Sequence, residues 1–124
     1  RDMTLAVGEW GTAGLLTEWL HELPDAERYV VGATVVAGGK AALNAADAEA
    51  DVLTGDDAVF TRTTSALASA MRTRFRADIG LAVGGVSAAA VDGSDPPRLT
   101  IALATRDGVL VRTAPYTGHS AILK

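Results

Sequence analysis

Apolar positions along the chain fall into short runs and into stretches of helical spacing, and together they predict an α/β domain. Short apolar runs bounded by glycine, proline or polar turn residues predict strands at 4–8, 29–37, 78–85, 99–105 and 109–113. Helical spacing of apolar residues predicts helices at 15–23 and 61–75, and an alanine-rich stretch predicts another at 40–50. Asp107-Gly108 predicts a hairpin turn between the last two strands. This order favours a three-layer α/β/α sandwich with a mixed sheet of about five strands.

The segment 4–16 (TLAVGEWGTAGLL) leads from the first predicted strand through a turn of small residues into the first predicted helix. Ligands of open α/β sheets bind beyond the carboxyl ends of strands, close to helix N-termini. The strand at 78–85 also ends in two glycines, so both loops are expected to face one crevice. The predicted ligand-binding residues at this crevice are Glu9, Trp10, Gly11, Gly14, Gly84, Gly85 and Ser87.

Composition narrows the class of protein. A chain of 124 residues fits one domain, residues 1–124, and its six aromatic residues leave the core to Ala, Val and Leu. The net charge of −4 argues against a nucleic-acid partner, because such binding depends on neutralising phosphates. No apolar run approaches a bilayer-spanning length, so no membrane partner is expected.

The absence of cysteine narrows the chemistry. It excludes disulfides, a thiolate nucleophile and cysteine-based metal sites, and it fits a reducing, cytoplasmic location. His21 and His119 have no metal-binding partner at helical spacing, so neither a metal nor another cofactor is predicted.

Four blocks of the sequence resemble the C-terminal domain family of the competence/damage-inducible protein CinA. TLAVGEWGTAGLL resembles the family's T-L-A-x-A-E-S-C-T-G-G-L-L, and LPDAERYVVGATVVA resembles V-P-G-A-S-x-x-F-x-G-G-V-V-A-Y. ADIGLAVGGVS and LTIALATRDG are similar to A-D-x-G-L-A-V-T-G-I-A and V-x-I-A-L-A-x-x-D-G, in family order. Many members are nicotinamide mononucleotide amidohydrolases. Members usually carry a further helix at each end, so the resemblance implies that these 124 residues lack both helices or include them only in part.

The catalytic positions depart from the family pattern. Trp10 stands where the family has its nucleophilic serine, and tryptophan cannot act as a nucleophile. The family's activating tyrosine has no counterpart, and Lys40 matches its lysine in a shortened stretch. The loop G-I-A-G-P becomes GVSAA, whereas Glu9, Thr12 and Gly14 are retained.

Each retained or altered residue has two interpretations. Trp10 either stacks on a flat ligand ring or fills the space that a substrate would occupy, and its bulk favours the second. Glu9 either complements the dipole at the start of the helix or holds a polar substrate group. Thr12 either caps the helix, the favoured interpretation, or serves as a substitute nucleophile activated by Lys40.

Three functions follow from these alternatives. The first is a divergent member without amidohydrolase activity, retained as an interaction module or as a binding module for a nucleotide-like small molecule. The second is an active amidohydrolase in which Thr12 or Ser87 attacks and Lys40 activates it. The third is a structural self-association domain, which would make the protein a homo-oligomer.

Overall fold

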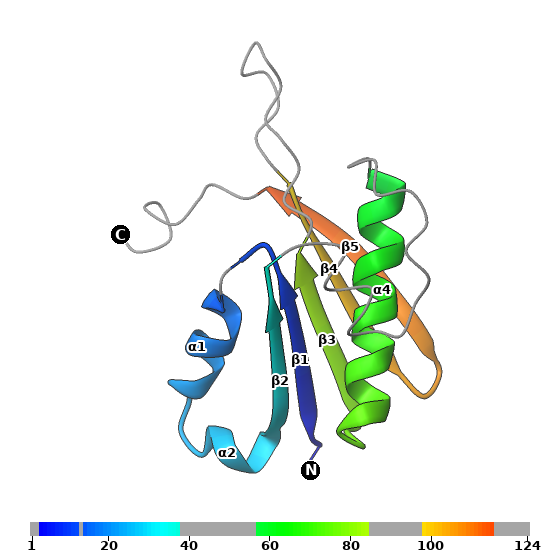
Figure 1. Cartoon of the computed structure of the whole chain (residues 1–124). Helices are drawn as coiled ribbons and strands as arrows, with labels where there is room; N and C mark the ends of the chain where they lie inside the picture. Colours follow the sequence, from blue (N-terminus) through cyan, green and yellow to red (C-terminus); the bar gives the residue numbers. More distant parts are fainter. Residues whose placement is uncertain (1–2, 13, 38–56, 85–97, 116–124) are drawn as a thin grey trace.

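The computed structural model describes residues 3–12, 14–37, 57–84 and 98–115, which form a sheet flanked by helices (Figure 1). The elements, in chain order, are β1 (Leu5–Trp10), α1 (Leu15–His21), α2 (Ala26–Tyr29), β2 (Val30–Val36), α4 (Asp57–Arg74), β3 (Ile79–Gly84), β4 (Arg98–Thr105) and β5 (Gly108–Pro115).

The sheet is mixed and five-stranded, as predicted. Its strand order is β2-β1-β3-β4-β5, with β1 parallel to both of its neighbours and β4 antiparallel to β3 and β5. The carboxyl ends of β1 and β3 therefore lie side by side, and Trp10 pairs with Gly84. The two strand ends from which the predicted crevice was inferred are thus neighbours.

Helix α4 packs closely on one face of the sheet because that face is lined by small side chains. These are Ala6 and Gly8 on β1, Gly80 and Ala82 on β3, and Ala102 and Ala104 on β4. A Cβ atom at position 80 would lie 2.0 Å from the carbonyl oxygen of Ala68, so only glycine permits this approach of the helix backbone. Leu67 and Met71 of α4 are fully buried against these strands.

Strand β1 continues two residues beyond its predicted end at residue 8. Successive side chains of a strand point to opposite faces, so Glu9 and Trp10 diverge. Glu9 bonds to the start of α1, whereas Trp10 bonds to α4. The two helices thus lie on opposite faces of the sheet, in the arrangement of an α/β/α sandwich (Figure 1).

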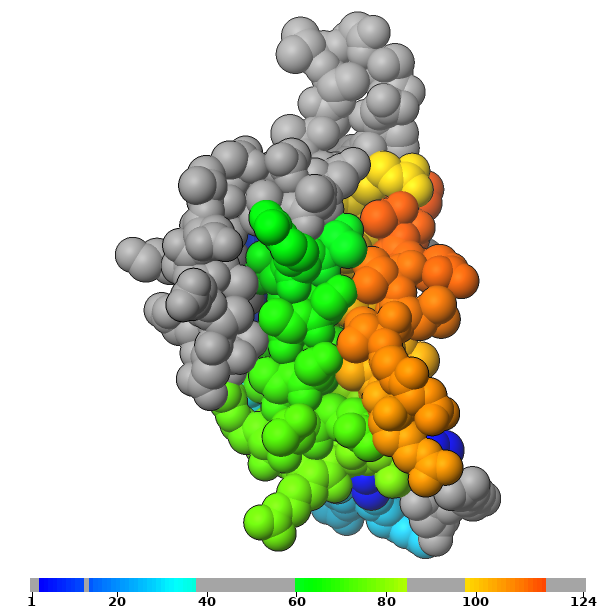
Figure 2. All heavy atoms as spheres, turned by 90° about the vertical axis from the view of Figure 1, so that its right-hand side faces the viewer, coloured from blue at the N-terminus to red at the C-terminus, as the bar shows by residue number. Residues whose placement is uncertain are grey.

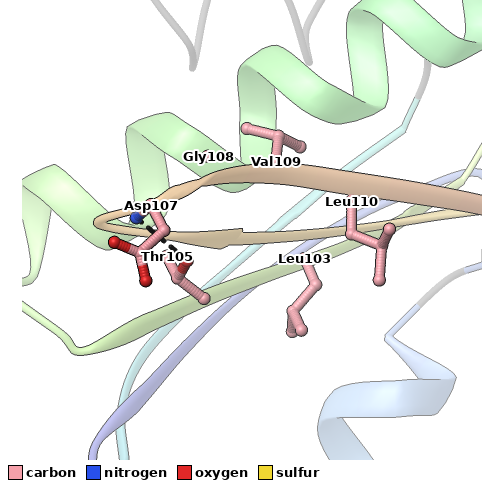
Figure 3. Close-up of a pocket in the computed structure, with 6 residues that line it drawn as sticks. All are labelled: Leu103, Thr105, Asp107, Gly108, Val109 and Leu110. Atoms are coloured by element: carbon pink, nitrogen blue, oxygen red, sulfur yellow. Dashed lines mark hydrogen bonds between the residues drawn. The ribbon is translucent and has the colours of Figure 1, made fainter.

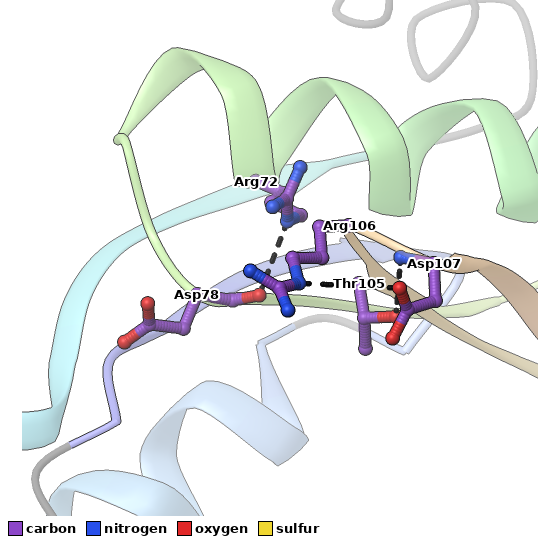
Figure 4. Close-up of polar contacts among 5 residues, drawn as sticks. All are labelled: Arg72, Asp78, Thr105, Arg106 and Asp107. Carbon is purple, nitrogen blue, oxygen red and sulfur yellow. Dashed lines mark hydrogen bonds and ion pairs between the residues drawn. The ribbon is translucent and has the colours of Figure 1, made fainter.

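A hydrogen-bonded clip joins the start of β1 to the turn between α4 and β3. The carboxylate of Asp78 accepts the backbone N–H of Thr4 at 2.8 Å, and the N–H of Asp78 is donated to the Thr4 hydroxyl oxygen at 3.0 Å. Thr4 also accepts the N–H of Ile79 at 3.0 Å, and the Nε of Arg72 donates to the Asp78 carbonyl at 3.1 Å (Figure 4). These bonds hold the amino ends of β1 and β3 together.

The helices differ from the prediction at their ends. Helix α1 ends at His21 instead of residue 23, and α2 was not predicted. Helix α4 begins at Asp57 instead of residue 61, and Thr63 and Thr64 lie inside it, where both are buried. The predicted helix at 40–50 and loop at 86–97 lie outside the described residues. Among the helices that the structure describes, none is long and apolar enough to cross a membrane.

The predicted hairpin is present, displaced by one residue. Thr105 pairs with Gly108, so Arg106 and Asp107 form the turn and Gly108 begins β5. The hydroxyl of Thr105 accepts the N–H of Asp107 at 3.2 Å, and Arg106 Nε lies 3.9 Å from Asp107 Oδ1 (Figure 4). The Asp-Gly signal located the hairpin correctly, and the strand register set its two turn residues.

Candidate functional site

Trp10 occupies the space between the carboxyl ends of β1 and β3 and helix α4. Its side chain is only 6% exposed, and its indole Nε1 donates to the hydroxyl oxygen of Thr64 at 3.0 Å. The ring meets Phe60 edge-on, with centroids 5.5 Å apart. A Cβ atom at position 84 would lie 2.2 Å from Trp10 Cδ1, so the indole requires glycine on the neighbouring strand. These contacts favour the space-filling interpretation of Trp10.

Glu9 is fully buried on the opposite face of β1, where its carboxylate accepts four hydrogen bonds. Oε1 accepts the Thr12 hydroxyl at 2.6 Å and the N–H of Leu16 at 3.0 Å. Oε2 accepts the N–H of Thr17 at 2.7 Å and also the Thr17 hydroxyl. The two N–H groups belong to the first turn of α1, where no helix carbonyl can accept them. Glu9 therefore caps α1 from the preceding strand, at the end where the helix dipole favours an anion.

The turn between β1 and α1 depends on two glycines in the left-handed region. Gly11 has φ 85° and Gly14, the residue at the N-cap position, has φ 84°. The carbonyl of Thr12 accepts the N–H of Leu15 at 3.2 Å, which tightens the entry into the helix. Gly11 is exposed, and no atom lies within 4 Å of the position that its Cβ would take. The backbone at Gly11 is therefore the open part of this turn.

The favoured interpretation of Thr12 as a helix cap is wrong. A capping hydroxyl accepts an N–H of the first helical turn, whereas the Thr12 hydroxyl donates to Glu9. Thr12 is buried beside that carboxylate. The capping is done by Glu9, three residues earlier in the chain.

The structure brings together most of the residues predicted for the crevice. Those at the carboxyl ends of β1 and β3 are Glu9, Trp10, Gly11, Thr12, Gly14 and Gly84. They do not share one surface, because Glu9 faces α1 while the Trp10 ring covers Gly84 beneath α4. Lys40, Gly85 and Ser87 lie outside the described residues. Within the part of the chain that the structure describes, no cluster of His, Asp or Glu could hold a metal ion.

The pairing of Thr12 with Glu9 has the distance of a nucleophile and its base, but its surroundings point to a structural role. The 2.6 Å separation lies within the range of proton transfer. However, the Glu9 oxygens already accept three further donors, and a proton taken up there would displace one of them. Loss of such a donor would release the first turn of α1. Glu9 is therefore suited to hold the turn in place.

Thr64 is the partner of Trp10 that the sequence analysis missed. Its hydroxyl is buried on the face of α4 that contacts the sheet, one turn before Ala68. A threonine pair within an otherwise apolar helix face is the signal that could have drawn attention to it. Nothing in the sequence, however, indicates that the donor to this hydroxyl is Trp10, at the end of β1.

Comparison with known proteins gives a consistent assignment. The family model described as CinA C-terminal domain matches residues 1–122. A CinA-like protein of Frankia casuarinae is 34% identical over 119 residues, which are 95% of this chain and 28% of that protein. A CinA-like protein of Gloeobacter violaceus is 37% identical over 84 residues, covering 68% of this chain and 20% of that protein. The chain thus spans less than a third of the length of these relatives.

Solved structures agree on the fold. The competence/damage inducible protein CihA from Agrobacterium tumefaciens superposes with a TM-score of 0.78 at 23% identity, over 98% of this chain and 76% of that one. A competence or damage-inducible protein from Enterobacter asburiae gives 0.77 at 22% identity, over 97% and 77%. At such identities the likeness concerns the fold alone.

Proposed function

Because this chain belongs to the CinA C-terminal domain family, we propose that it is a divergent member that has lost amidohydrolase activity and is retained as a binding module. One observation carries the proposal. At the position of the family nucleophile, the indole of Trp10 is buried under α4 and hydrogen-bonded to Thr64. A side chain held in this way offers neither a nucleophilic atom nor room for an amide substrate.

The turn from Gly11 to Gly14 is the surface proposed for a nucleotide-like small molecule. Its backbone is open at Gly11, and it is held in one conformation by the bonds to Glu9. A preorganised turn next to a strand end is the usual location of ligands in sheets of this type. Glu9 contributes here by fixing the turn, since its oxygens are occupied by protein donors.

An assay of ammonia release from nicotinamide mononucleotide tests the loss of activity. The purified protein is expected to release none above a blank without protein. Release that disappears in Thr12→Ala would instead establish the alternative enzyme with a substitute nucleophile, whose hydroxyl lies 2.6 Å from the Glu9 carboxylate. Release that persists in Thr12→Ala and in Lys40→Ala would indicate a contaminating enzyme.

A thermal-shift titration tests the binding role separately. Ligands that bind only the folded state raise the melting temperature in proportion to the logarithm of their concentration. Pyridine nucleotides are expected to raise it for the unmodified protein, and less for Gly11→Asn, which places a side chain on the open turn and tolerates its left-handed backbone. Absence of a shift with every nucleotide tried would contradict the nucleotide-binding role while leaving the loss of activity intact.

A further inference from the structure

Strand β5 forms one edge of the sheet and runs along the outer side of α4 (Figure 2). Its register with β4 is unbroken from Gly108 to Pro115. The two residues that flank a two-residue hairpin turn form a hydrogen-bonded pair. Along an antiparallel ladder, hydrogen-bonded pairs alternate with pairs whose backbone groups point away from the partner strand. Because Thr105 and Gly108 form that pair, the backbone N–H groups of Val109, Val111 and Thr113 point away from β4.

One charged side chain covers this edge. Arg112 Nη1 donates to the carbonyl oxygen of Val111 at 2.9 Å, which requires that carbonyl to point outward, as the register predicts. Charged residues on edge strands prevent uncontrolled pairing with other chains. An incoming strand must therefore attract Arg112 away from the carbonyl that it occupies.

The charges of the described residues are separated across the sheet. Residues 60–84 and 98–115 contain seven arginines and two aspartates. Residues 14–37 contain four acidic residues and one arginine. The excess positive charge thus lies on the side of the molecule that carries β5, and the hairpin itself holds Arg98, Arg106 and Arg112 against one acidic residue, Asp107.

Apolar side chains accompany the outward backbone groups. Val109 is 43% exposed and Leu110 is 52% exposed. Leu103 and Leu110 point to the same side of the hairpin and line an open hollow of about 330 Å³ (Figure 3). An extended segment lying along β5 would place its apolar side chains beside Val109 on one face and its acidic side chains beside Arg112 on the other, the face that also carries Leu110.

We propose that the β5 edge is a docking site for an acidic, extended segment of a partner protein, which adds to the sheet as a further strand. The outward N–H and C=O groups select a peptide backbone over a nucleic acid, which cannot continue a β ladder. Arg112 favours acidic side chains, because a bond to a carboxylate would replace the bond to the Val111 carbonyl that the incoming strand breaks. A second copy of this chain fits less well, since pairing β5 with itself would bring two sets of hairpin arginines together.

Fluorescence anisotropy with two synthetic peptides tests the site. The first is nine residues long with glutamate alternating with valine, and the second has lysine in place of glutamate. Saturable binding of the glutamate peptide alone is expected, together with slower hydrogen exchange at the amides of Val109, Val111 and Thr113. Binding that weakens as salt increases is also expected. Equal binding of both peptides, or no saturation up to about 1 mM, would overturn the proposal.

Two variants distinguish the backbone from the charge contribution. Val109→Pro removes one outward N–H without removing a bond to β4, and is expected to weaken binding roughly two- to ten-fold. Val109→Thr, its control, keeps the N–H and is expected to bind normally. Arg112→Gln is expected to weaken binding about two- to five-fold. Melting temperatures of all three verify folding, and unchanged affinity in Val109→Pro would refute strand addition.

The proposal is independent of the lost amidohydrolase activity, because β3 and β4 separate β5 from the Trp10 turn. Ammonia release would leave it standing, and failure of the peptide to bind would leave the conclusion on activity standing. If the three amides became protected with rising protein concentration in the absence of peptide, the edge would be an interface between two copies and the proposal would be wrong.

Discussion

Replacing Trp10 with the serine of the family is expected to destabilise the domain strongly. The Trp10 side chain is only 6% exposed, and its indole packs edge-on against Phe60. A buried aromatic of this kind covers about 200 Å² and contributes about 5 kcal/mol at 25 cal/mol per Å². Measured truncations of buried tryptophan cost about 3–5 kcal/mol. The expected loss for Trp10→Ser is therefore about 4 kcal/mol.

This loss corresponds to a measurable change in melting temperature. With an unfolding entropy of about 2.1 cal/mol/K per residue, a domain of this length loses about 15 °C for a loss of about 4 kcal/mol. Circular dichroism during heating and urea unfolding measure both quantities without relying on tryptophan emission. Trp19→Ser makes the same chemical change at a residue that is 39% exposed, so it is expected to cost less than about 1 kcal/mol.

Comparing the stability losses of Trp10→Ser and Trp19→Ser tests whether Trp10 supports the packing of α4. Equal losses in the two variants would show that Trp10 does not support the packing of α4 on the sheet. Trp10→Phe provides a milder variant that keeps an aromatic ring but makes it smaller and removes the bond to Thr64, with an expected cost of about 1–3 kcal/mol. None of these variants is expected to release ammonia from nicotinamide mononucleotide, because the family's tyrosine is also missing.

Other substitutions test the remaining supports of the site. Glu9→Gln replaces one acceptor oxygen with an NH₂ group that faces existing donors, and is expected to lower the free energy of unfolding by about 2–4 kcal/mol. The control, Glu18→Gln at an exposed position, is expected to lower it by less than about 0.5 kcal/mol. Urea unfolding measures both. Gly80→Ala forces α4 off the sheet and is expected to cost about 2–4 kcal/mol in the same measurement. Asp78→Ala removes the carboxylate that accepts the N–H of Thr4, and is expected to cost about 1–2 kcal/mol and to speed hydrogen exchange at the Thr4 amide. An exchange rate equal to that of the unmodified protein would contradict the role of Asp78 in joining β1 to β3.

The pattern of apolar residues was sufficient to predict the sheet. Every described strand overlaps a predicted one, because apolar runs bounded by turn residues are local features. Helix ends were predicted less well. Helix α4 starts four residues before the predicted position, and tertiary packing buries Thr63 and Thr64 inside it, which no local pattern indicates.

The strand, turn and helix start at residues 4–16 were predicted, but the contacts of their side chains depend on residues distant in the chain. Glu9 was predicted to suit a helix N-terminus, and the structure confirms this through its bonds to the N–H groups of Leu16 and Thr17. Thr12 was assigned the capping role that Glu9 performs, because the prediction ended β1 at residue 8 and left both residues in a turn. The bond from Trp10 to Thr64 joins residues 54 positions apart, and no local pattern indicates such a partner.

The two-residue extension of β1 explains why the turn can keep its shape when the residue at position 10 changes. Since strand residues alternate between faces, Glu9 supports α1 while its neighbour faces α4. A substitution at position 10 therefore changes packing against α4 and Gly84 without disturbing the carboxylate that holds the turn. The reverse is not expected, because a change at position 9 would release the helix start itself. Under the proposed function, an indole at position 10 would thus replace the reactive group while Glu9 keeps the glycine turn in place for a ligand.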